Sequence, residues 1–546
     1  MNTVGKYLCD RLKSLGVDHV FGVPGDYVLD LMDVLGENSL ELVGTCNELN
    51  AGYAADAYAR VKGLGAVCIT YGVGGFSLVN AVVGAYAERV PLVVISGAPN
   101  SSVRNSRNHL LLHHTTGDYN LQYSIMEKAT VASVILTNAT QAPSQIDKAF
   151  AACLHHKRPV YIEIPQDLVN QPCKPCEPLE IPPPNFTDTE ALKEAVQEAA
   201  DLLEAAQRPV ILAGVEFHRF GLEEKLLNLL ETTGYPIATT LLGKSCISEA
   251  HPQFIGTYVG ALSRENVTGR IETADCVLCL GAIMSDMNLG GNTAKLDQNK
   301  LINANSDKVK IKHHFYDPVF LGDFIDELTS KLTHKEYESL DIKPAYYLRI
   351  KEFTPQPEQK ITNLRFYERL NHFINDGFMV ISDTGDAIVA TIDLLMTKGT
   401  DFIGQAFYLS IGYSIPACLG AGLASNSRPM VFVGDGAFQM TAQELSTIIR
   451  HNLNPIIFLI NNDGYTIERV IKDGTYNDLQ PWKYHQLPRI FGKSWSCEVR
   501  TEGELEEALT QAKANTDCVS FIEVHLDRFD CAQGLIRLGR ALRGKS

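Results

Sequence analysis

One stretch of the 546-residue chain, residues 430–470, restricts the fold more than any other. An apolar run there ends abruptly in Gly434-Asp435-Gly436, which is how a buried parallel strand ends in a tight turn. Residues 441–451 carry apolar side chains at helical spacing, and a second apolar run, 455–460, leads into Asn461-Asn462-Asp463-Gly464. The order strand, turn, helix, strand, turn predicts a parallel α/β sheet that binds ligands at the carboxyl ends of its strands.

The two turns of this unit offer oxygen ligands for a metal ion at one edge of the predicted sheet. They are the carboxylate of Asp435, the side-chain oxygen of Asn462 and a backbone carbonyl near Gly464. Mg²⁺ suits such a set, because it binds few protein oxygens and keeps other positions for water and phosphate. Each turn alone is an ordinary turn-forming sequence, but their succession at neighbouring strand ends favours a metal site.

The same two turns resemble the signature of thiamine-diphosphate-dependent enzymes. The longer run 461–468, Asn-Asn-Asp-Gly-Tyr-Thr-Ile-Glu, is similar to that of pyruvate, indolepyruvate and branched-chain 2-oxo acid decarboxylases, and the resemblance covers essentially the whole chain. It implies that Asp435, Asn462 and the carbonyl of Gly464 hold the Mg²⁺ that binds the cofactor's diphosphate. It also implies non-oxidative decarboxylation of a 2-oxo acid to an aldehyde and CO₂.

Helix and strand patterns alternate along the chain, which predicts open α/β domains with parallel sheets. A stretch rich in proline, residues 171–184, reads as a semi-rigid linker, and 343–360 is a second loose stretch. We therefore expect three such domains, at 1–182, 186–342 and 361–546. By the resemblance they are a pyrimidine-binding, a central and a diphosphate-binding domain, and the first and third share one plan.

Composition excludes several classes of partner. The net charge of −16 argues against nucleic acid and anionic membranes, and no apolar run is long enough to span a membrane. The N-terminus lacks the pattern of a signal peptide. Several of the thirteen cysteines lie in apolar runs, as expected of a reduced, cytoplasmic protein. Cys173 and Cys176 form a Cys-x-x-Cys pair, but no second pair completes a zinc site.

Glu48 directly follows a predicted strand, within the otherwise uncharged stretch 43–53. Partial burial there would raise the pKa of its carboxyl group. The alternative is an ordinary glutamate at a helix N-terminus, interacting with the helix dipole. The resemblance implies that Glu48 is the activating glutamate, which hydrogen-bonds the aminopyrimidine ring of the cofactor.

Three further candidates for acid–base work lie in the first domain. The pair His113-His114 has two counterparts elsewhere, at 155–156 and 313–314, so adjacent histidines need no special role in this chain. The resemblance singles out the first pair, and histidine exchanges protons near neutral pH. Asp26 by itself is a turn-forming or capping residue. The resemblance places Asp26, His113 and His114 together in proton transfer.

The third domain contributes the remaining candidates. Glu468 would be a solvated residue in the first turn of a helix, but the resemblance implies a catalytic glutamate that assists decarboxylation and proton transfer. Ile411 matches the bulky residue that bends the cofactor, although core packing alone would explain an isoleucine there. By resemblance the cofactor contacts Glu48, Thr384, Asp386, Ile411, Gly436, Ala437, Asn462, Tyr465 and Ile467.

The substrate is the least determined feature. Pyruvate-restricted bacterial members of the family carry aromatic residues where this chain has Met287, or a neighbour, and Ile388. We therefore expect a pocket wide enough for branched-chain or aromatic 2-oxo acids. The residues expected to line it are Thr384, Ile388, Met287, Ile467 and Ile471.

Several alternatives stay open. The enzyme could be specific for pyruvate, or a carboligase of the acetohydroxyacid synthase type, although a carboligase should avoid the proton donors His113, His114 and Glu468. A non-catalytic relic is disfavoured by the full residue set, and a dinucleotide-dependent dehydrogenase lacks its glycine fingerprint. The resemblance further implies a homodimer or homotetramer with active sites between subunits. One chain would then supply Glu48, Asp26 and the His pair, and the other the metal loop and Glu468.

Overall fold

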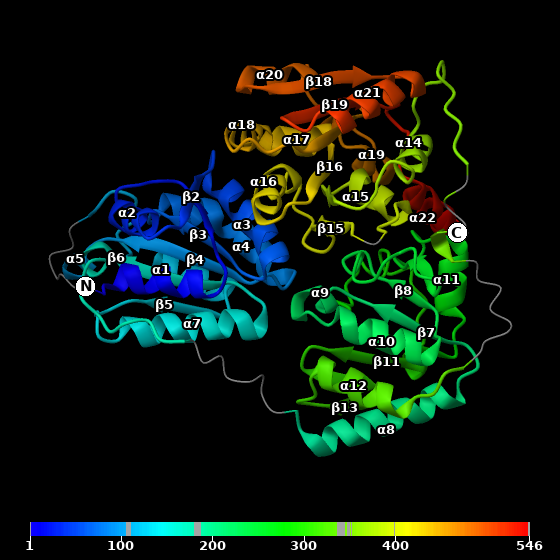
Figure 1. Ribbon diagram of the computed structural model, residues 1–546, viewed down its shortest axis with the longest axis horizontal. Helices are drawn as coiled ribbons and strands as arrows, with labels where there is room; N and C mark the ends of the chain where they lie inside the picture. The colour runs from blue at the N-terminus through cyan, green and yellow to red at the C-terminus, as the bar shows by residue number, and fades with distance from the viewer. Residues whose placement is uncertain are drawn as a thin grey trace.

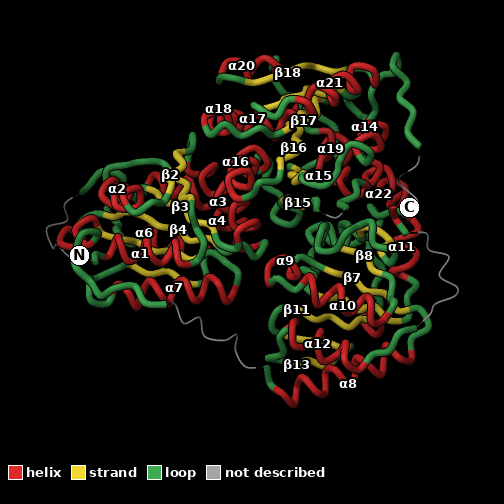
Figure 2. The backbone as a smooth tube through the Cα atoms, in the orientation of Figure 1, coloured by secondary structure: helices red, strands yellow, loops and turns green. Residues whose placement is uncertain are grey.

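The computed structural model describes residues 2–104, 111–178, 187–335, 344–346, 350, 352–397 and 399–543. It contains three bodies, each built on its own sheet and covered by helices on both faces (Figures 1 and 2). The fold class expected from the sequence is therefore confirmed. Of the predicted linkers, residues 179–184, 343, 347–349 and 351 lie outside the described residues.

The first sheet has six parallel strands in the order β2-β1-β3-β4-β6-β5. Its strands are β1 (His19–Gly22), β2 (Glu41–Gly44), β3 (Gly65–Ile69), β4 (Leu92–Ala98), β5 (Ala132–Ile135) and β6 (Val160–Pro165). The helices include α1 (Val4–Ser14), α2 (Leu29–Glu37), α3 (Glu48–Lys62), α4 (Val73–Ala87), α6 (Leu121–Ala129) and α7 (Ala142–His156).

The last sheet repeats this plan in the order β15-β14-β16-β17-β19-β18, again with parallel strands throughout. Its strands are β14 (Phe378–Ser382), β15 (Asp401–Gly404), β16 (Arg428–Gly434), β17 (Ile456–Asn461), β18 (Ser494–Val499) and β19 (Val519–His525). When the strands of each sheet are numbered in chain order from one, both sheets have the order 2-1-3-4-6-5. The first and third bodies therefore share one topology.

The middle sheet has the order β13-β12-β11-β10-β7-β8-β9. Its strands are β7 (Pro209–Ala213), β8 (Ile237–Thr239), β9 (Phe254–Thr257), β10 (Cys276–Leu280), β11 (Leu301–Asn305), β12 (Lys308–Ile311) and β13 (His314–Tyr316). Strands β11, β12 and β13 pair in antiparallel fashion, a feature that the sequence pattern did not predict. Their connections are too short for the crossover that parallel neighbours need.

The helix expected at 441–451 begins earlier than predicted. Helix α17 (Asp435–Thr441) starts directly at the end of β16 and continues through a 3₁₀ turn, η4 (Ala442–Glu444), into α18 (Leu445–Arg450). The side chain of Asp435 accepts the backbone N–H of Gly436 at 2.7 Å. Helix α17 therefore begins at the residue that follows the last residue of β16, with no loop between them.

Helix α3 of the first body packs against α16 (Ser414–Ala424) of the last, and Figure 1 shows the two side by side. Both helices carry small residues, so their backbones approach closely. A Cβ atom on Gly420 would lie 1.8 Å from the carbonyl oxygen of Ala54. The hydroxyl of Tyr413 also donates to the buried carboxylate of Asp56 at 2.6 Å. The two bodies of one chain are thus joined by a tight, partly polar contact.

Among the described residues, no helix combines the length and apolarity needed to cross a membrane.

Candidate active site

A cavity of about 390 Å³ lies at the carboxyl ends of β14, β16 and β17. The third body supplies almost all of its wall, and Met287 comes from the middle one. Of the residues expected from the sequence, the cavity is lined by Met287, Thr384, Asp386, Ile388, Ile411, Asp435, Gly436, Ala437, Asn462, Gly464, Tyr465, Ile467 and Glu468. All the site residues attributed to the third domain except Ile471 are thus brought together around one space.

Asp435 lies buried at the end of β16, between the two turns. Its Oδ1 atom accepts the N–H of Gly436 at 2.7 Å, and its Oδ2 atom accepts the N–H of Gly464 at 2.9 Å. Burial raises the pKa of this carboxyl group to about 7, although the two N–H donors favour the ionised form. A bound cation would favour the carboxylate further.

Asn462 follows β17, the parallel neighbour of β16. Its side chain is buried and lines the cavity, and among the described residues its amide has no hydrogen-bond partner. An amide oxygen that is open to the cavity can bind a metal ion together with the carboxylate of Asp435, so the donor set fits Mg²⁺.

Arg469, which the sequence analysis missed, holds this turn from behind. Its buried guanidinium donates to the backbone oxygen of Asn462 at 3.0 Å, to that of Asp463, and to the carboxylate of Asp478 at 3.1 Å. These bonds fix the turn in which Asp463 and Gly464 both have positive φ angles. Its position next to Glu468 was the only sequence signal.

The cavity also has a narrow apolar cradle. A Cβ atom on Gly436 would lie 2.4 Å from the ring of Tyr465, so only glycine fits beneath that ring. Ile411 lies half-buried on the wall. A polar end at Asp435 and Asn462 joined to this apolar part fits a cofactor that has a diphosphate and aromatic rings.

Asp383 is a second residue that the sequence analysis did not single out for a role. It is fully buried, and its carboxylate accepts the backbone N–H groups of Gly412 at 2.9 Å and Ser414 at 2.8 Å. Burial raises the pKa of this group to about 6. The hydroxyl of Thr441 donates to the carbonyl of Gly412 at 2.7 Å. The loop that presents Ile411 is therefore held from two sides.

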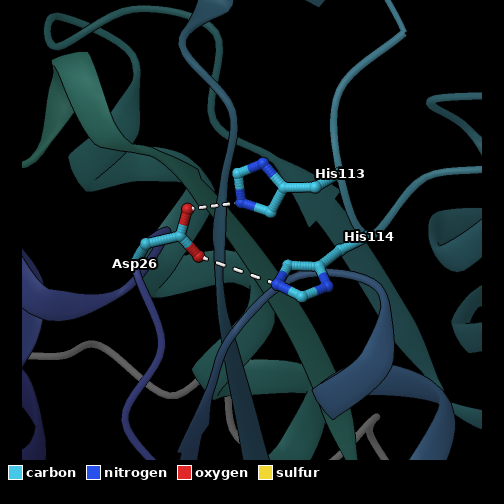
Figure 3. A group of neighbouring side chains, drawn as sticks. All are labelled: Asp26, His113 and His114. Atoms are coloured by element: carbon cyan, nitrogen blue, oxygen red, sulfur yellow. Dashed lines mark hydrogen bonds and ion pairs between the residues drawn. The ribbon is translucent and has the colours of Figure 1, made fainter.

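The first body brings together Asp26, His113 and His114, as the sequence analysis expected (Figure 3). The Nε2 atom of His113 lies 2.6 Å from Oδ2 of Asp26, and Nε2 of His114 lies 3.9 Å from Oδ1. The ring of Tyr27 stacks on that of His113 with 5.0 Å between centroids. All three polar side chains are exposed. They form an accessible cluster in which one carboxylate faces two imidazoles.

Glu48 is the first residue of α3, beside the glycine-rich start of α4. Asn47 caps α3 by accepting the N–H of Asn50 at 2.8 Å. Glu444 of the last body, fully buried, accepts the N–H of Cys46 at 3.1 Å and the side-chain N–H of Asn50 at 2.7 Å. Glu444 therefore fixes the helix end that presents Glu48, a role the sequence analysis missed.

Within one chain, the predicted site residues lie in two separate places. The described residues that line the cavity do not include Glu48, Asp26, His113 or His114. Ile471, expected in the substrate pocket, is also absent from the wall of the cavity and is 74% exposed. It ends helix α19 (Thr466–Ile471), and only the first turn of that helix borders the cavity.

Comparison with protein families and individual proteins identifies the chain. Three family models match: the N-terminal TPP binding domain of thiamine pyrophosphate enzymes over residues 2–122, their central domain over 196–330, and their C-terminal TPP binding domain over 383–524. Thiamine pyrophosphate is another name for thiamine diphosphate.

Similar proteins cover nearly the full length. An alpha-keto-acid decarboxylase of Mycobacterium leprae is 37% identical over 98% of this chain and 95% of the relative. A probable pyruvate decarboxylase of Schizosaccharomyces pombe is 35% identical, with 98% and 95% covered. Pyruvate decarboxylase 4 of Arabidopsis thaliana is 36% identical, with 98% and 91% covered. The chain therefore belongs to the thiamine-diphosphate-dependent 2-oxo acid decarboxylases, which are carbon–carbon lyases.

Proposed function

We propose that the cavity binds thiamine diphosphate with Mg²⁺, and that the enzyme decarboxylates 2-oxo acids whose side chains are larger than that of pyruvate. The observation that carries the metal site is the buried carboxylate of Asp435 beside the unpartnered amide of Asn462, at adjacent strand ends. These two side chains and the carbonyl of Gly464 would hold Mg²⁺. When bound, the cofactor takes up the electron pair that departing CO₂ leaves behind.

The residues around the cofactor would orient and enclose it. Its contacts would come from Thr384, Asp386, Ile411, Gly436, Ala437, Tyr465 and Ile467, all of which line the cavity. Asp386 is itself held by the N–H of Ala532 at 2.7 Å and the amide of Asn363 at 2.9 Å. A wall fixed in this way would keep the substrate and the reactive part of the cofactor in one geometry.

Proton transfer would be carried out by carboxylate and imidazole side chains. Glu468 borders the cavity, where it would serve both the loss of CO₂ and the later proton transfer. The Nε2 atom of His113 lies 2.6 Å from the carboxylate of Asp26, which is close enough for a proton to pass between the two groups. Glu48 would contact the aminopyrimidine ring and activate the cofactor.

We propose that a second copy of the chain supplies Glu48, Asp26, His113 and His114 to each cavity. The divided site supports this assembly, because the described wall of the cavity contains Glu468 but none of these four residues. Large apolar side chains are also exposed near both halves, including Leu111 at 69% beside the histidine pair and Ile471 at 74% at the end of α19. A homodimer, or a tetramer made of two dimers, would cover such surfaces.

The substrate wall supports a wide pocket. Met287, Ile388 and Ile467 line the cavity, and none of the three is aromatic. Specificity for pyruvate is the alternative, and two of the relatives above are named pyruvate decarboxylases. A carboligase is disfavoured by the Asp26–His113 pair, because a proton donor ends the reaction at the aldehyde.

The test compares pyruvate, 2-oxoisovalerate, phenylpyruvate and indolepyruvate with thiamine diphosphate and Mg²⁺. Aldehyde is detected by direct product analysis and, where an alcohol dehydrogenase accepts it, by NADH oxidation. We expect at least one larger substrate to exceed pyruvate in kcat/KM by about tenfold, since each added methylene in an apolar pocket contributes about 1–3 kcal/mol.

The variant Ile388→Phe makes this test specific for the pocket. It should lower kcat/KM for phenylpyruvate far more than for pyruvate, because the phenylalanine ring would take up space in the cavity that Ile388 lines. A strong wild-type preference for pyruvate would contradict the wide pocket but leave the decarboxylase intact. Formation of acetolactate without aldehyde would instead support the carboligase.

We also propose that the enzyme works in the cytoplasm. All thirteen cysteines are free, and eight of them are buried. This pattern is typical of proteins that remain in a reducing compartment.

A further inference from the structure

Two histidines and two glutamates gather at the far edge of the third body, outside the cavity. His485 lies in the 3₁₀ turn η6 (Tyr484–Gln486), Glu498 in β18, and Glu523 and His525 in β19. Strands β18 and β19 are parallel neighbours in which Glu498 pairs with Glu523. Because Glu523 and His525 are two residues apart on one strand, they project from the same face of the sheet.

The ligand atoms of this cluster lie close together. The Nδ1 atom of His485 is 2.7 Å from Oε2 of Glu523, and the Nε2 atom of His525 is 3.0 Å from Oε2 of Glu498 and 3.4 Å from Oε1 of Glu523. One ligand atom each from His485, Glu498 and Glu523 lies within 4.8 Å of the others. Ligands of a tetrahedral Zn²⁺ ion lie about 3.3 Å apart, given bonds of about 2.0–2.1 Å. Small side-chain shifts would therefore admit an ion.

The charges of the cluster also favour a cation. Glu523 is buried and paired in register with a second carboxylate, while the two imidazoles carry charge only when protonated. Arg500 approaches the outer carboxylate, Glu498, at 3.1 Å. The other groups on Glu523 are neutral donors, the amide of Asn461 at 2.7 Å and the N–H of His485 at 2.9 Å. The cluster thus holds two carboxylates beside two imidazoles, with Arg500 as the one permanently charged cation that contacts it among the described residues.

We propose that His485, Glu498, Glu523 and His525 form a second metal site, which binds a divalent transition-metal ion such as Zn²⁺. Two nitrogen and two carboxylate ligands suit Zn²⁺, whereas Mg²⁺ prefers oxygen ligands throughout. Glu498 and His525 are partly exposed, which gives the ion a path from solvent. Glu523 also accepts a hydrogen bond from Asn461, the residue before Asn462, so the site is linked to the turn that we propose binds Mg²⁺.

The test is Zn²⁺ binding to protein freed of metals, measured by calorimetry with excess Mg²⁺ present to occupy the cavity site. The Asp26 cluster is a possible second Zn²⁺ site, so all titrations use a His113→Ala background. In that background we expect one Zn²⁺ per chain. His525→Ala and Glu498→Gln should each weaken binding at least tenfold, which corresponds to about 1.4 kcal/mol.

The matched control is His314→Ala, which removes an exposed histidine that lies 2.9 Å from Glu198 in the middle body. It should leave Zn²⁺ binding unchanged. Circular dichroism establishes that each variant is folded, and the visible spectrum of bound Co²⁺ reports on the ligands without any enzymatic assay. Equal affinity in His525→Ala, Glu498→Gln and their parent, or no binding by the parent, would overturn the proposal.

Discussion

Replacing Glu48 by Gln is expected to lower kcat by about 10²–10⁴-fold while leaving thiamine diphosphate bound, because the change removes an acid–base group but keeps its shape. The side chain opens α3, and its Oε1 atom would lie 3.3 Å from a Cβ atom on Gly74, so it is held at the glycine-rich start of α4. Steady-state kinetics with the preferred 2-oxo acid give kcat, and calorimetry gives the cofactor affinity.

The control for Glu48→Gln is Glu37→Gln, at the exposed end of α2. It makes the same chemical change away from both halves of the site and should leave kcat within twofold, since exposed substitutions generally have small effects. A Glu48→Gln enzyme with unchanged kcat and weakened cofactor binding would assign Glu48 to binding alone. An enzyme unchanged in both would remove it from the site.

Replacing Asp435 by Asn is expected to weaken binding of the Mg²⁺–cofactor complex by about a hundredfold, or about 2.7 kcal/mol. The variant loses the negative charge at the metal. It also presents an NH₂ group to one of the backbone donors, Gly436 or Gly464, which the carboxylate now satisfies. Calorimetric titration with thiamine diphosphate in excess Mg²⁺ measures the loss.

The neighbouring exposed residue provides the control for Asp435→Asn. Asp463→Asn makes the same change in the second turn of the site, at a positive φ angle that asparagine tolerates. It should bind the cofactor with nearly wild-type affinity. If both variants bound equally well, the carboxylate of Asp435 would not be the metal ligand.

The sequence was most informative where polar residues directly follow an apolar strand. Gly434-Asp435-Gly436 and Asn461-Asn462 are read locally, as an apolar run that stops at a turn, and the structure has both at the ends of adjacent strands. The antiparallel β12–β13 edge was missed because its short, mixed run, Lys308–Ile311, has no clear pattern. The start of α17 was misplaced because the strand passes into the helix without a loop.

The residues that support the site were not visible in the sequence, because their partners are distant. Asp383 acts on the backbone of residues 412–414, and Glu444 on a helix end nearly four hundred positions earlier. Nothing local distinguishes such carboxylates from surface ones. Ile471 shows the converse: its spacing from Ile467 places both on one helical face, yet only the first turn of α19 borders the cavity.

The central claim is that each active site combines Glu48 of one copy with the cavity of another. The most direct test is complementation between Glu48→Gln and Asp435→Asn chains, coexpressed with different tags and purified through both. In the proposed dimer, one site of each mixed pair carries both substitutions and the other carries neither. Mixed dimers should then regain about half of the wild-type activity, although each variant alone is nearly inactive. No regain of activity in mixed dimers that bind the cofactor would show that Glu48 acts within its own chain, and would contradict the account.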